Sequence, residues 1–343
     1  LGSMNEEHRA LELLPQFGRL VRDDEKQQDL VLYAADTPNS WKVGTLLEEL
    51  RVPYDVVNVD IMSNQQKQPS YTAMNPNGRT PVLLDRSANP PFSVFESNAI
   101  LLFLADKYAS PLLPRDPEAR SEVEQWLMWQ ISALGPMFGQ CMYFKRIATT
   151  SVADIARLQF GIDRFHAECV RLVKILDARL ANRDYICGPG RGVYTLADIA
   201  CWGYAASFFW AGIDVEGLAA LQRWLSRLGE RPAVVAGARV PGVPILGATG
   251  VLFEDMRTDA SIQDTLTTGA RRAGRPFFNW DDMKALAGTQ NVEVFAGQPE
   301  FQSRHGSSQP SSRGRPTTPP PVAWMVVGML AGLVIGRNVW GAR

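Results

Sequence analysis

The sequence predicts a two-domain protein, with an α/β domain first and an all-helical domain second. In the first region, apolar strand-like runs alternate with amphipathic helical patterns, whereas from residue 118 onward the periodicity is helical. A proline-rich segment, residues 110–117, separates the two regions and reads as a linker. The length of 343 residues suits two domains with extensions at the ends.

The first domain is expected over residues 29–111. Strands are predicted at residues 29–35, 54–61 and 81–85, and helices at residues 42–50 and 97–107. In the first helix, Val43, Leu46, Leu47 and Leu50 follow the i, i+3, i+4, i+7 spacing of a buried face. This βαβ–ββα order fits a thioredoxin-like domain.

The second domain is expected over residues 118–240. Two apolar stripes support it, one from Val123 to Leu134 and one from Ile162 to Leu180. Thr195 and Asp198 have the spacing of a helix N-terminal capping box, with Asp in place of the usual Glu. We therefore interpret Asp198 as a buried cap rather than a catalytic acid.

The two ends of the chain differ from the domains. Residues 1–28 form a charged N-terminal extension, and residues 241–321 a flexible Pro-, Ser- and Arg-rich linker that is largely disordered by composition. Residues 322–336 carry no charge and span about 22 Å as a helix. Extended to residue 340, this hydrophobic helix has the layout of a tail anchor in an intracellular membrane, with a cytoplasmic catalytic domain. A helix docked on the protein itself or in a dimer is the alternative.

Charge and cysteine spacing exclude several classes of function. A net charge of −1 gives no support for nucleic-acid binding. The four cysteines form no CxxC pair and no metal-binding spacing, and the three histidines are scattered, so we expect no metal. Cys169 and Cys201 lie on apolar helical faces and are interpreted as core thiols, in a protein of a reducing compartment.

Residues 75–100 predict a site for a small zwitterionic peptide. Thr80-Pro81 suggests a cis bond at a tight corner, which would leave the backbone of Thr80 unpaired and free to bind an extended ligand. Glu96 can take an ammonium group, and the Ser97 hydroxyl at a helix N-terminus can take a carboxylate. A peptide backbone with these two ends and a nearby thiol describes glutathione.

The segment TPNS, residues 37–40, is where donors to the thiol should lie, because it joins the first strand to the first helix. The Thr37 hydroxyl and the Asn39 amide are the catalytic candidates, since hydrogen bonds and the helix N-terminus stabilise a thiolate. Without a resident CxxC the reactive sulfur must arrive with the ligand. Tyr33 sits in an apolar strand and is interpreted as core.

At this point the chain resembles the glutathione transferase family, within it the nu-class or disulfide-bond oxidoreductase branch that includes the fungal nitrogen-regulator prion-like proteins. The matching segments fall in family order and cover roughly residues 29–240; they are residues 37–50, 75–85, 95–108, 133–140, 162–168 and 195–202. The resemblance implies a thioredoxin-like N-terminal domain, an all-α transferase C-terminal domain, glutathione as substrate and a homodimer.

The resemblance also implies roles for individual residues. Thr37 and Asn39 match the positions that contact the thiol. The positions that match glutathione-binding residues are Gln66, Arg79, Thr80, Pro81, Glu96, Ser97 and Arg164. The alternative for Arg164 is a surface charge on a helix.

Two departures from the family pattern concern the second substrate. Ser40 replaces a usual glycine and is followed by the bulky Trp41, and Cys141 begins an apolar stretch where polar residues are usual. We expect Trp41 and Cys141 in a second-substrate pocket that is more apolar than usual, with the Cys141 thiol exposed.

Three functions remain open from the sequence. The first is glutathione-dependent reduction of a small disulfide, or transfer, by the thiolate of bound glutathione. The second is a conjugating transferase for an apolar electrophile. The third is a non-enzymatic, membrane-tethered binding or regulatory module.

Overall fold

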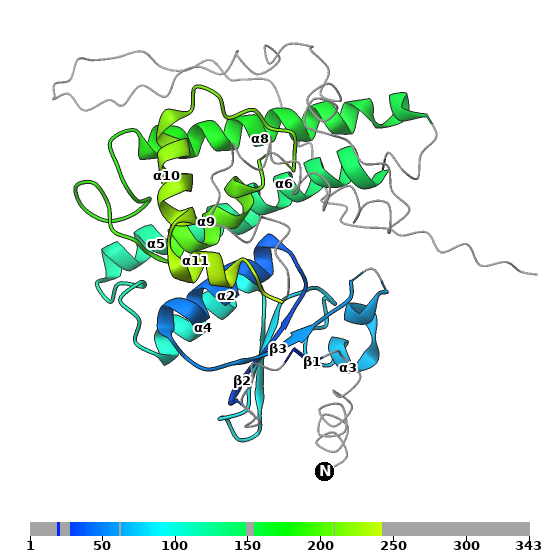
Figure 1. Ribbon diagram of the computed structural model, residues 1–343, viewed down its shortest axis with the longest axis vertical. Helices are drawn as coiled ribbons and strands as arrows, with labels where there is room; N and C mark the ends of the chain where they lie inside the picture. Colours follow the sequence, from blue (N-terminus) through cyan, green and yellow to red (C-terminus); the bar gives the residue numbers. More distant parts are fainter. Residues whose placement is uncertain (1–18, 21–27, 62, 149–153, 209, 242–343) are drawn as a thin grey trace, which may run out of the picture. The chain divides into compact units, whose positions relative to one another are not determined.

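The computed structural model describes residues 19–20, 28–61, 63–148, 154–208 and 210–241 (Figure 1). A thioredoxin-like α/β region comes first in these residues, and a helical region follows it. This order agrees with the predicted fold class. The predicted domain limits, residues 29–111 and 118–240, stay a prediction.

The sheet has five strands in the order β1-β3-β2-β4-β5. Their bounds are β1 Arg19–Leu20, β2 Leu30–Ala34, β3 Asp55–Asn58, β4 Val82–Asp85 and β5 Phe92–Phe95. The central strand β2 pairs in parallel with β3 and antiparallel with β4, and β5 continues antiparallel beyond β4. β1 pairs antiparallel with β3, so the predicted N-terminal extension contributes an edge strand that we did not expect.

Both faces of the central strand β2 are buried, which explains why all five of its residues, Leu30–Ala34, are apolar. Along β2, Leu30 and Leu32 join the large core shared with the helical region. Val31 and Tyr33 alternate with them and join a second, smaller core on the other face. Tyr33 is 1% exposed, which confirms its interpretation as a core residue.

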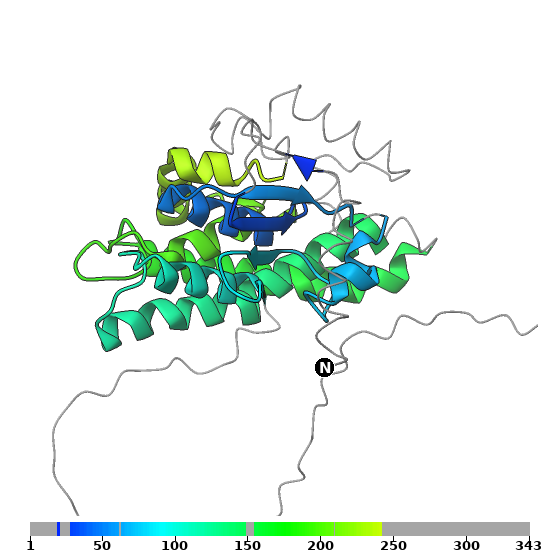
Figure 2. The same ribbon diagram turned by 90° about the horizontal axis from the view of Figure 1, so that it is seen from below.

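Helices cover both faces of the sheet (Figures 1 and 2). α2 (Pro38–Leu50) and α4 (Ser97–Lys107) lie between the sheet and the helical region, whereas η2 (Gln65–Lys67) and α3 (Pro69–Thr72) lie on the side of the smaller core. α2 begins four residues before the predicted start at Lys42. The difference arises because Thr37 caps the helix and a proline occupies its first turn, where its fixed φ is favourable.

The helical region begins with a nearly continuous helical path of several segments. They are α5 Pro117–Trp129, the π-helical η3 Gln130–Leu134, α6 Gly135–Met142 and the π-helical η4 Tyr143–Ala148. The remaining elements are η5 Ile155–Leu158, α8 Gln159–Leu180, α9 Leu196–Ala206, α10 Ala219–Gly229 and α11 Pro232–Gly237. Short π-helical segments inside α-helices are frequent at functional sites, which directs attention to η3.

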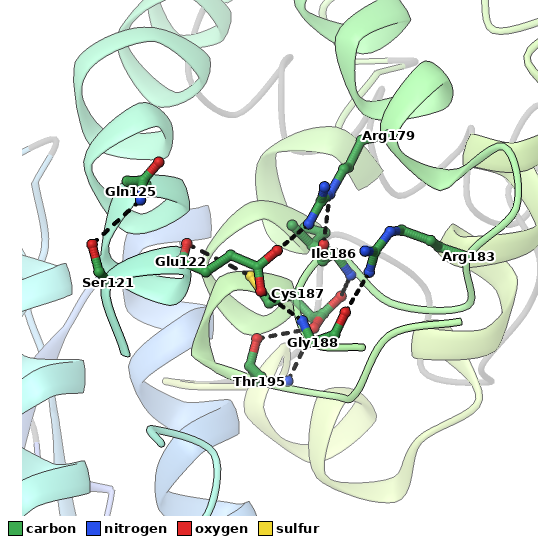
Figure 3. A network of polar contacts seen from close by, with 10 residues as sticks. Ser121, Glu122, Gln125, Arg179, Arg183, Ile186, Cys187, Gly188 and Thr195 are labelled. Atoms are coloured by element: carbon green, nitrogen blue, oxygen red, sulfur yellow. Dashed lines mark hydrogen bonds and ion pairs between the residues drawn. The ribbon is translucent and has the colours of Figure 1, made fainter. Parts of the chain in front are cut away.

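The loop before α9 is fixed by a polar network shown in Figure 3. Glu122 of α5 accepts a hydrogen bond from the Gly188 N–H (2.8 Å) and forms an ion pair with Arg179 of α8. Arg179 Nε in turn donates to the Ile186 carbonyl (2.8 Å). Two helices therefore hold one loop by charge-assisted hydrogen bonds, which are stronger than neutral ones.

The capping box at the start of α9 is present as predicted. Asp198 Oδ2 accepts a hydrogen bond from the Thr195 N–H (3.0 Å), and Asp198 Oδ1 accepts from the Trp224 indole (2.9 Å) and the Ile186 N–H (3.0 Å). Asp198 is fully buried, and burial raises its pKa to about 6. Its role as a structural cap is confirmed.

α11 closes the helical region against the α/β region. A Cβ atom at Gly237 would lie 2.2 Å from Thr45 N of α2, so the two helices approach as closely as glycine allows. Beside this contact, Arg231 binds Glu49 through two hydrogen bonds of 3.0 and 3.2 Å and lies over the Tyr194 ring. The contact between the two regions is thus tight and partly ionic.

The predicted linker and hydrophobic helix fall in residues 242–343, outside the described part of the chain. In the part that is described, none of the helices combines the length and the apolar character needed to cross a bilayer. The prediction of a tail anchor at residues 322–340 therefore stays a prediction.

Candidate functional site

A cavity of about 950 Å³ lies where the α/β region meets the helical region. Its volume is at the upper end of the usual range for small-molecule sites, which is roughly 300–1,000 Å³. The α/β region supplies the residues of one wall: Asp36, Thr37, Pro38, Asn39, Trp41, Ile61, Asn77, Arg79, Glu96 and Ser97. The helical region supplies the other: Gln130, Ile131, Gly135, Pro136, Gly139, Gln140, Met142, Tyr143, Tyr204, Ser207 and Trp210.

The turn between β2 and α2 forms the start of the first wall. Thr37 is the N-cap of α2, and its side chain and carbonyl both accept from the Ser40 N–H. Ser40 is fully buried, and its hydroxyl accepts a hydrogen bond from the Ala35 N–H (3.3 Å). The Ser40 side chain therefore forms its hydrogen bond inside the turn. The Thr37 side chain remains at the cavity wall.

Asn39 lies in the first turn of α2 with both ends of its carboxamide bonded. Its Nδ2 donates to Tyr204 Oη at 2.9 Å, and its Oδ1 accepts from Ser97 Oγ at 3.3 Å. Three elements, α2, α4 and α9, thus meet at one amide. Since the helix N-terminus carries a partial positive charge, an anion in the cavity beside Asn39 is favoured.

The corner before β4 has the predicted geometry. The Thr80-Pro81 peptide bond is cis. Arg79 directly precedes this bond, and its carbonyl accepts hydrogen bonds from Tyr71 Oη (2.8 Å) and Asn75 Nδ2 (2.7 Å). These bonds fix the loop before β4. No hydrogen bond joins the Thr80 backbone to another residue that the structure describes. An unpaired strand-like backbone at this corner can bind an extended ligand.

Glu96 and Ser97 lie at the start of α4. Glu96 is exposed and has a φ of 67°, a conformation that is uncommon for residues other than glycine. Residues held in such conformations concentrate at functional sites, because the surrounding structure must compensate for the strain. Ser97 is the first residue of α4 and is buried, so it lies at a helix N-terminus, a position that favours anions.

A buried lysine behind the cavity wall was not predicted from the sequence. Lys42 is 2% exposed, and its Nζ donates to Asn98 Oδ1 (2.8 Å) and Gln130 Oε1 (2.7 Å). Burial lowers its pKa to about 7. The hydrogen bonds join α2, α4 and the π-helical η3, and Gln130 itself lines the cavity. A lysine inside an otherwise apolar helical stretch was the available signal.

Six of the predicted residues are brought together at the cavity. They are Thr37, Asn39, Trp41, Arg79, Glu96 and Ser97. Thr80 and Pro81 adjoin Arg79 without lining the cavity themselves. Gln66 does not line it either; its Nε2 donates to the Ile61 carbonyl (3.3 Å), and its Oε1 is buried and accepts no hydrogen bond from the described residues. The glutathione-binding roles of these residues stay predictions.

Arg164 is not brought to the cavity. It is an exposed residue of α8 and lies 4.0 Å from Glu168, one helical turn away. The arrangement is that of a surface ion pair, which was the alternative drawn from the sequence. A contact between Arg164 and glutathione stays a prediction.

The expectation of an exposed thiol at Cys141 is wrong. Cys141 is 0% exposed, lies outside the cavity lining, and its Sγ donates to the Ala211 carbonyl (3.4 Å). The helical period explains the correction, because the neighbouring Met142 and Tyr143 face the cavity and thereby turn Cys141 into the core. All four cysteines are buried as free thiols.

Comparison with known proteins places this geometry in a family. A model of the glutathione S-transferase N-terminal domain matches residues 28–106. The disulfide-bond oxidoreductase YfcG of Escherichia coli is 35% identical over 205 residues, which cover 59% of this chain and 91% of the relative.

Solved structures agree. A glutathione transferase from Burkholderia graminis, with two glutathione molecules bound per subunit, superposes with a TM-score of 0.58 at 35% identity, over 64% of this chain and 91% of the other. One from Pseudomonas putida, with one glutathione disulfide bound per subunit, has a TM-score of 0.58 at 32% identity, over 64% of this chain and 95% of the other. The cavity lies beside a cis-proline corner, the family model matches the α/β region, and the chain covers about nine tenths of each relative. The chain therefore belongs to the glutathione S-transferase family.

Proposed function

We propose that the protein reduces small disulfides, with the thiolate of bound glutathione as the nucleophile. One observation carries the proposal: the cavity holds donors at the N-terminus of α2, yet none of the described residues that line it is a cysteine. The nucleophile must therefore come with the ligand. The relatives named as a disulfide-bond oxidoreductase and as glutathione transferases with bound glutathione or glutathione disulfide support the same chemistry.

The protein's contribution is to lower the pKa of the bound thiol. A free thiol titrates near 8.5, so only a small fraction is thiolate at neutral pH. A helix N-terminus contributes about 0.3–1 kcal/mol, and a hydrogen bond to a charged acceptor about 1.5–3 kcal/mol. The helix N-terminus and one hydrogen bond from Thr37 or Asn39 together contribute about 2–4 kcal/mol, which lowers the thiol pKa by about one to three units at about 1.36 kcal/mol per unit.

The reaction then proceeds by two thiol–disulfide exchanges. The glutathione thiolate attacks one sulfur of the substrate disulfide, forms a mixed disulfide and releases the other sulfur as a thiolate, which takes up a proton. A second glutathione attacks the mixed disulfide at its glutathione sulfur. The products are glutathione disulfide and a second substrate thiol, so two glutathiones supply the two electrons.

The rest of the tripeptide is assigned to the first wall of the cavity. The exposed Glu96 carboxylate suits the γ-glutamyl ammonium group, and the backbone N–H groups of Ser97 and its neighbours at the start of α4 suit the γ-glutamyl carboxylate. The unpaired Thr80 backbone beside Pro81 suits the cysteinyl backbone. Arg79, which lines the cavity, suits the remaining carboxylate. Gln66 is assigned to the tripeptide by the resemblance to the family.

A conjugating transferase for an apolar electrophile is the second candidate. Trp41 and several apolar side chains of the helical wall favour it: Ile131, Pro136, Met142, Tyr143 and Trp210. An apolar wall facing the sulfur would bind an aromatic electrophile and exclude water from it. A binding module without turnover is the third candidate.

One set of measurements separates these functions. Purified protein is tested for glutathione binding by calorimetry and for turnover of hydroxyethyl disulfide and of a chlorinated aromatic. We expect binding together with disulfide turnover. Turnover of the aromatic alone would favour the transferase, binding without turnover the module, and loss of binding would refute all three.

Two further proposals concern assembly. We expect a homodimer, supported by the exposed Phe92 and Phe95 on the edge strand β5 and Met128 on α5, which are 52%, 38% and 50% exposed. Light scattering of the purified protein tests it.

We also expect residues 322–340 to hold the protein at an intracellular membrane, which the uncharged run and its glycines at four-residue spacing support. Recovery of a chain lacking residues 322–343 from the membrane fraction would refute it.

A further inference from the structure

The amide of Asn39 is held by a residue that lies 165 positions away in the sequence. Tyr204 Oη of α9 accepts a hydrogen bond from Asn39 Nδ2 of α2 at 2.9 Å, so the helical region supplies this contact. The other end of the amide meets Ser97 Oγ at 3.3 Å. Of the two hydrogens on Nδ2, one is committed to Tyr204, which leaves the second for a ligand in the cavity.

Tyr204 has the properties of a fixed anchor. It is 9% exposed, it lines the cavity, and burial raises its pKa to about 12. The phenol therefore stays neutral over the pH range in which a thiol ionises, and its oxygen remains available to accept from the amide.

The backbone on which Tyr204 is mounted is also held against the turn. A Cβ atom at the adjacent Gly203 would lie 3.4 Å from both the Cβ atom and the carbonyl oxygen of Pro38. Helix α9 thus packs at van der Waals distance on the first turn of α2, next to Asn39. The position of the phenol relative to the amide is set by this packing and not by a flexible loop.

We propose that Tyr204 is a positioning residue of this site: it orients the Asn39 carboxamide so that its free N–H faces the sulfur of bound glutathione. The proposal rests on the proposed function, because it assigns a role in activating the thiol. Without the phenol oxygen, the amide retains only its contact with Ser97 and can rotate about its terminal torsion, which is broad for asparagine. The thiolate would then lose a directed donor.

The consequence is a specific change in the pH dependence. In the Tyr204→Phe variant the pKa of the bound thiol should rise by about one unit, and turnover at neutral pH should fall about tenfold, since one pKa unit is a tenfold change in the thiolate fraction below the pKa. Activity at high pH, where the thiol is ionised in both proteins, should be nearly restored. The affinity for glutathione should change little.

A double-mutant cycle tests whether Tyr204 acts through Asn39. The Tyr204→Phe, Asn39→Ala and combined variants are compared by the pH profile of kcat/KM for hydroxyethyl disulfide and by ultraviolet titration of the bound thiolate. If Tyr204 acts through Asn39, the Phe substitution should have no further effect once Asn39 is Ala. Tyr194→Phe is the matched control, because Tyr194 is a buried tyrosine of the same region that does not line the cavity.

Each outcome is informative. An unchanged thiol pKa in Tyr204→Phe, or full additivity with Asn39→Ala, would overturn the positioning role while leaving the proposed function intact. A loss of thermal stability in Tyr204→Phe with a wild-type pH profile would mean that the phenol only packs. If the wild-type protein binds no glutathione or turns over no disulfide, the proposed function fails first, and that result is visible before any variant is made.

Discussion

Lys42 provides the strongest test of the electrostatics behind the cavity. The Lys42→Met substitution keeps the length of the side chain and removes the amino group. This group is buried, and its hydrogen-bond acceptors among the residues that the structure describes are the amide oxygens of Asn98 and Gln130. No carboxylate of the described residues is hydrogen-bonded to it, and the charge of Glu96 offsets the effect of burial only in part. A charge buried without an opposite charge is unfavourable, and the group responds by releasing its proton more easily.

The magnitude follows from the pKa. Burial lowers the pKa of Lys42 from 10.5 to about 7. Between these two values the unfolded chain binds more protons than the folded chain, so the free energy of unfolding rises with pH across that window. The full shift corresponds to about 5 kcal/mol at 1.36 kcal/mol per unit. This is an upper limit, because two amide oxygens also stabilise the ammonium form.

The assay is urea unfolding at a series of pH values from 6.5 to 10.5, read by tryptophan fluorescence. The free energy of unfolding of wild type, minus that of Lys42→Met, should increase as the pH rises. The total increase should be several kcal/mol, with a slope of at most about 1.36 kcal/mol per pH unit. Subtracting the two proteins removes the titration of the other groups. Lys174→Met, at an exposed position of α8, is the control and should follow wild type. Parallel curves for wild type and Lys42→Met would refute the reasoning.

Three substitutions and one thiol-labelling experiment test the packing and the buried groups. Gly237→Ala should destabilise the protein by about 1–3 kcal/mol, because the added Cβ would meet the backbone of Thr45. Gly139→Ala should stabilise it by roughly 0.5–1 kcal/mol, because the added Cβ would have no atom within 4 Å. Thermal or urea unfolding measures both. Asp198→Ala should cost about 3 kcal/mol or more, since two backbone N–H groups, a hydroxyl and an indole would lose their acceptor; a cost below about 1 kcal/mol would contradict its role as a cap. Ellman's reagent should label no thiol rapidly in the folded protein and four in denaturant, and fast labelling of Cys141 would contradict its burial.

Several local features of both regions could be predicted from short stretches of sequence. The cis bond at Thr80-Pro81, the helix starting at Ser97 and the capping box of α9 all agree with the structure. Each depends on residues within a few positions of one another, such as the proline of an X–Pro bond or the side chain that caps a nearby N–H. The predicted start of α2 at Lys42 is too late, because Thr37 is the N-cap of the helix and Pro38 lies in its first turn. The prediction assigns both residues to the turn before the helix.

The orientation of single side chains around the cavity could not be predicted in the same way. A helical stretch defines a face only to within the angle that one residue covers, so Cys141 was assigned to the cavity wall although Met142 and Tyr143 occupy it. The buried position of Lys42 was missed for a related reason. Its partners Asn98 and Gln130 are 56 and 88 residues away, and nothing local indicates that they meet.

The family, the strand-turn-helix that begins the site, the cis corner and the lack of a CxxC dithiol there all follow from the amino-acid sequence. These are local properties, in which backbone preferences and capping act over a few residues. The contact of Tyr204 with Asn39, the burial of Lys42 and Cys141, and the surface position of Arg164 emerge only in the folded molecule. Such contacts depend on how helices from the two regions pack, and packing is a collective result of the whole core.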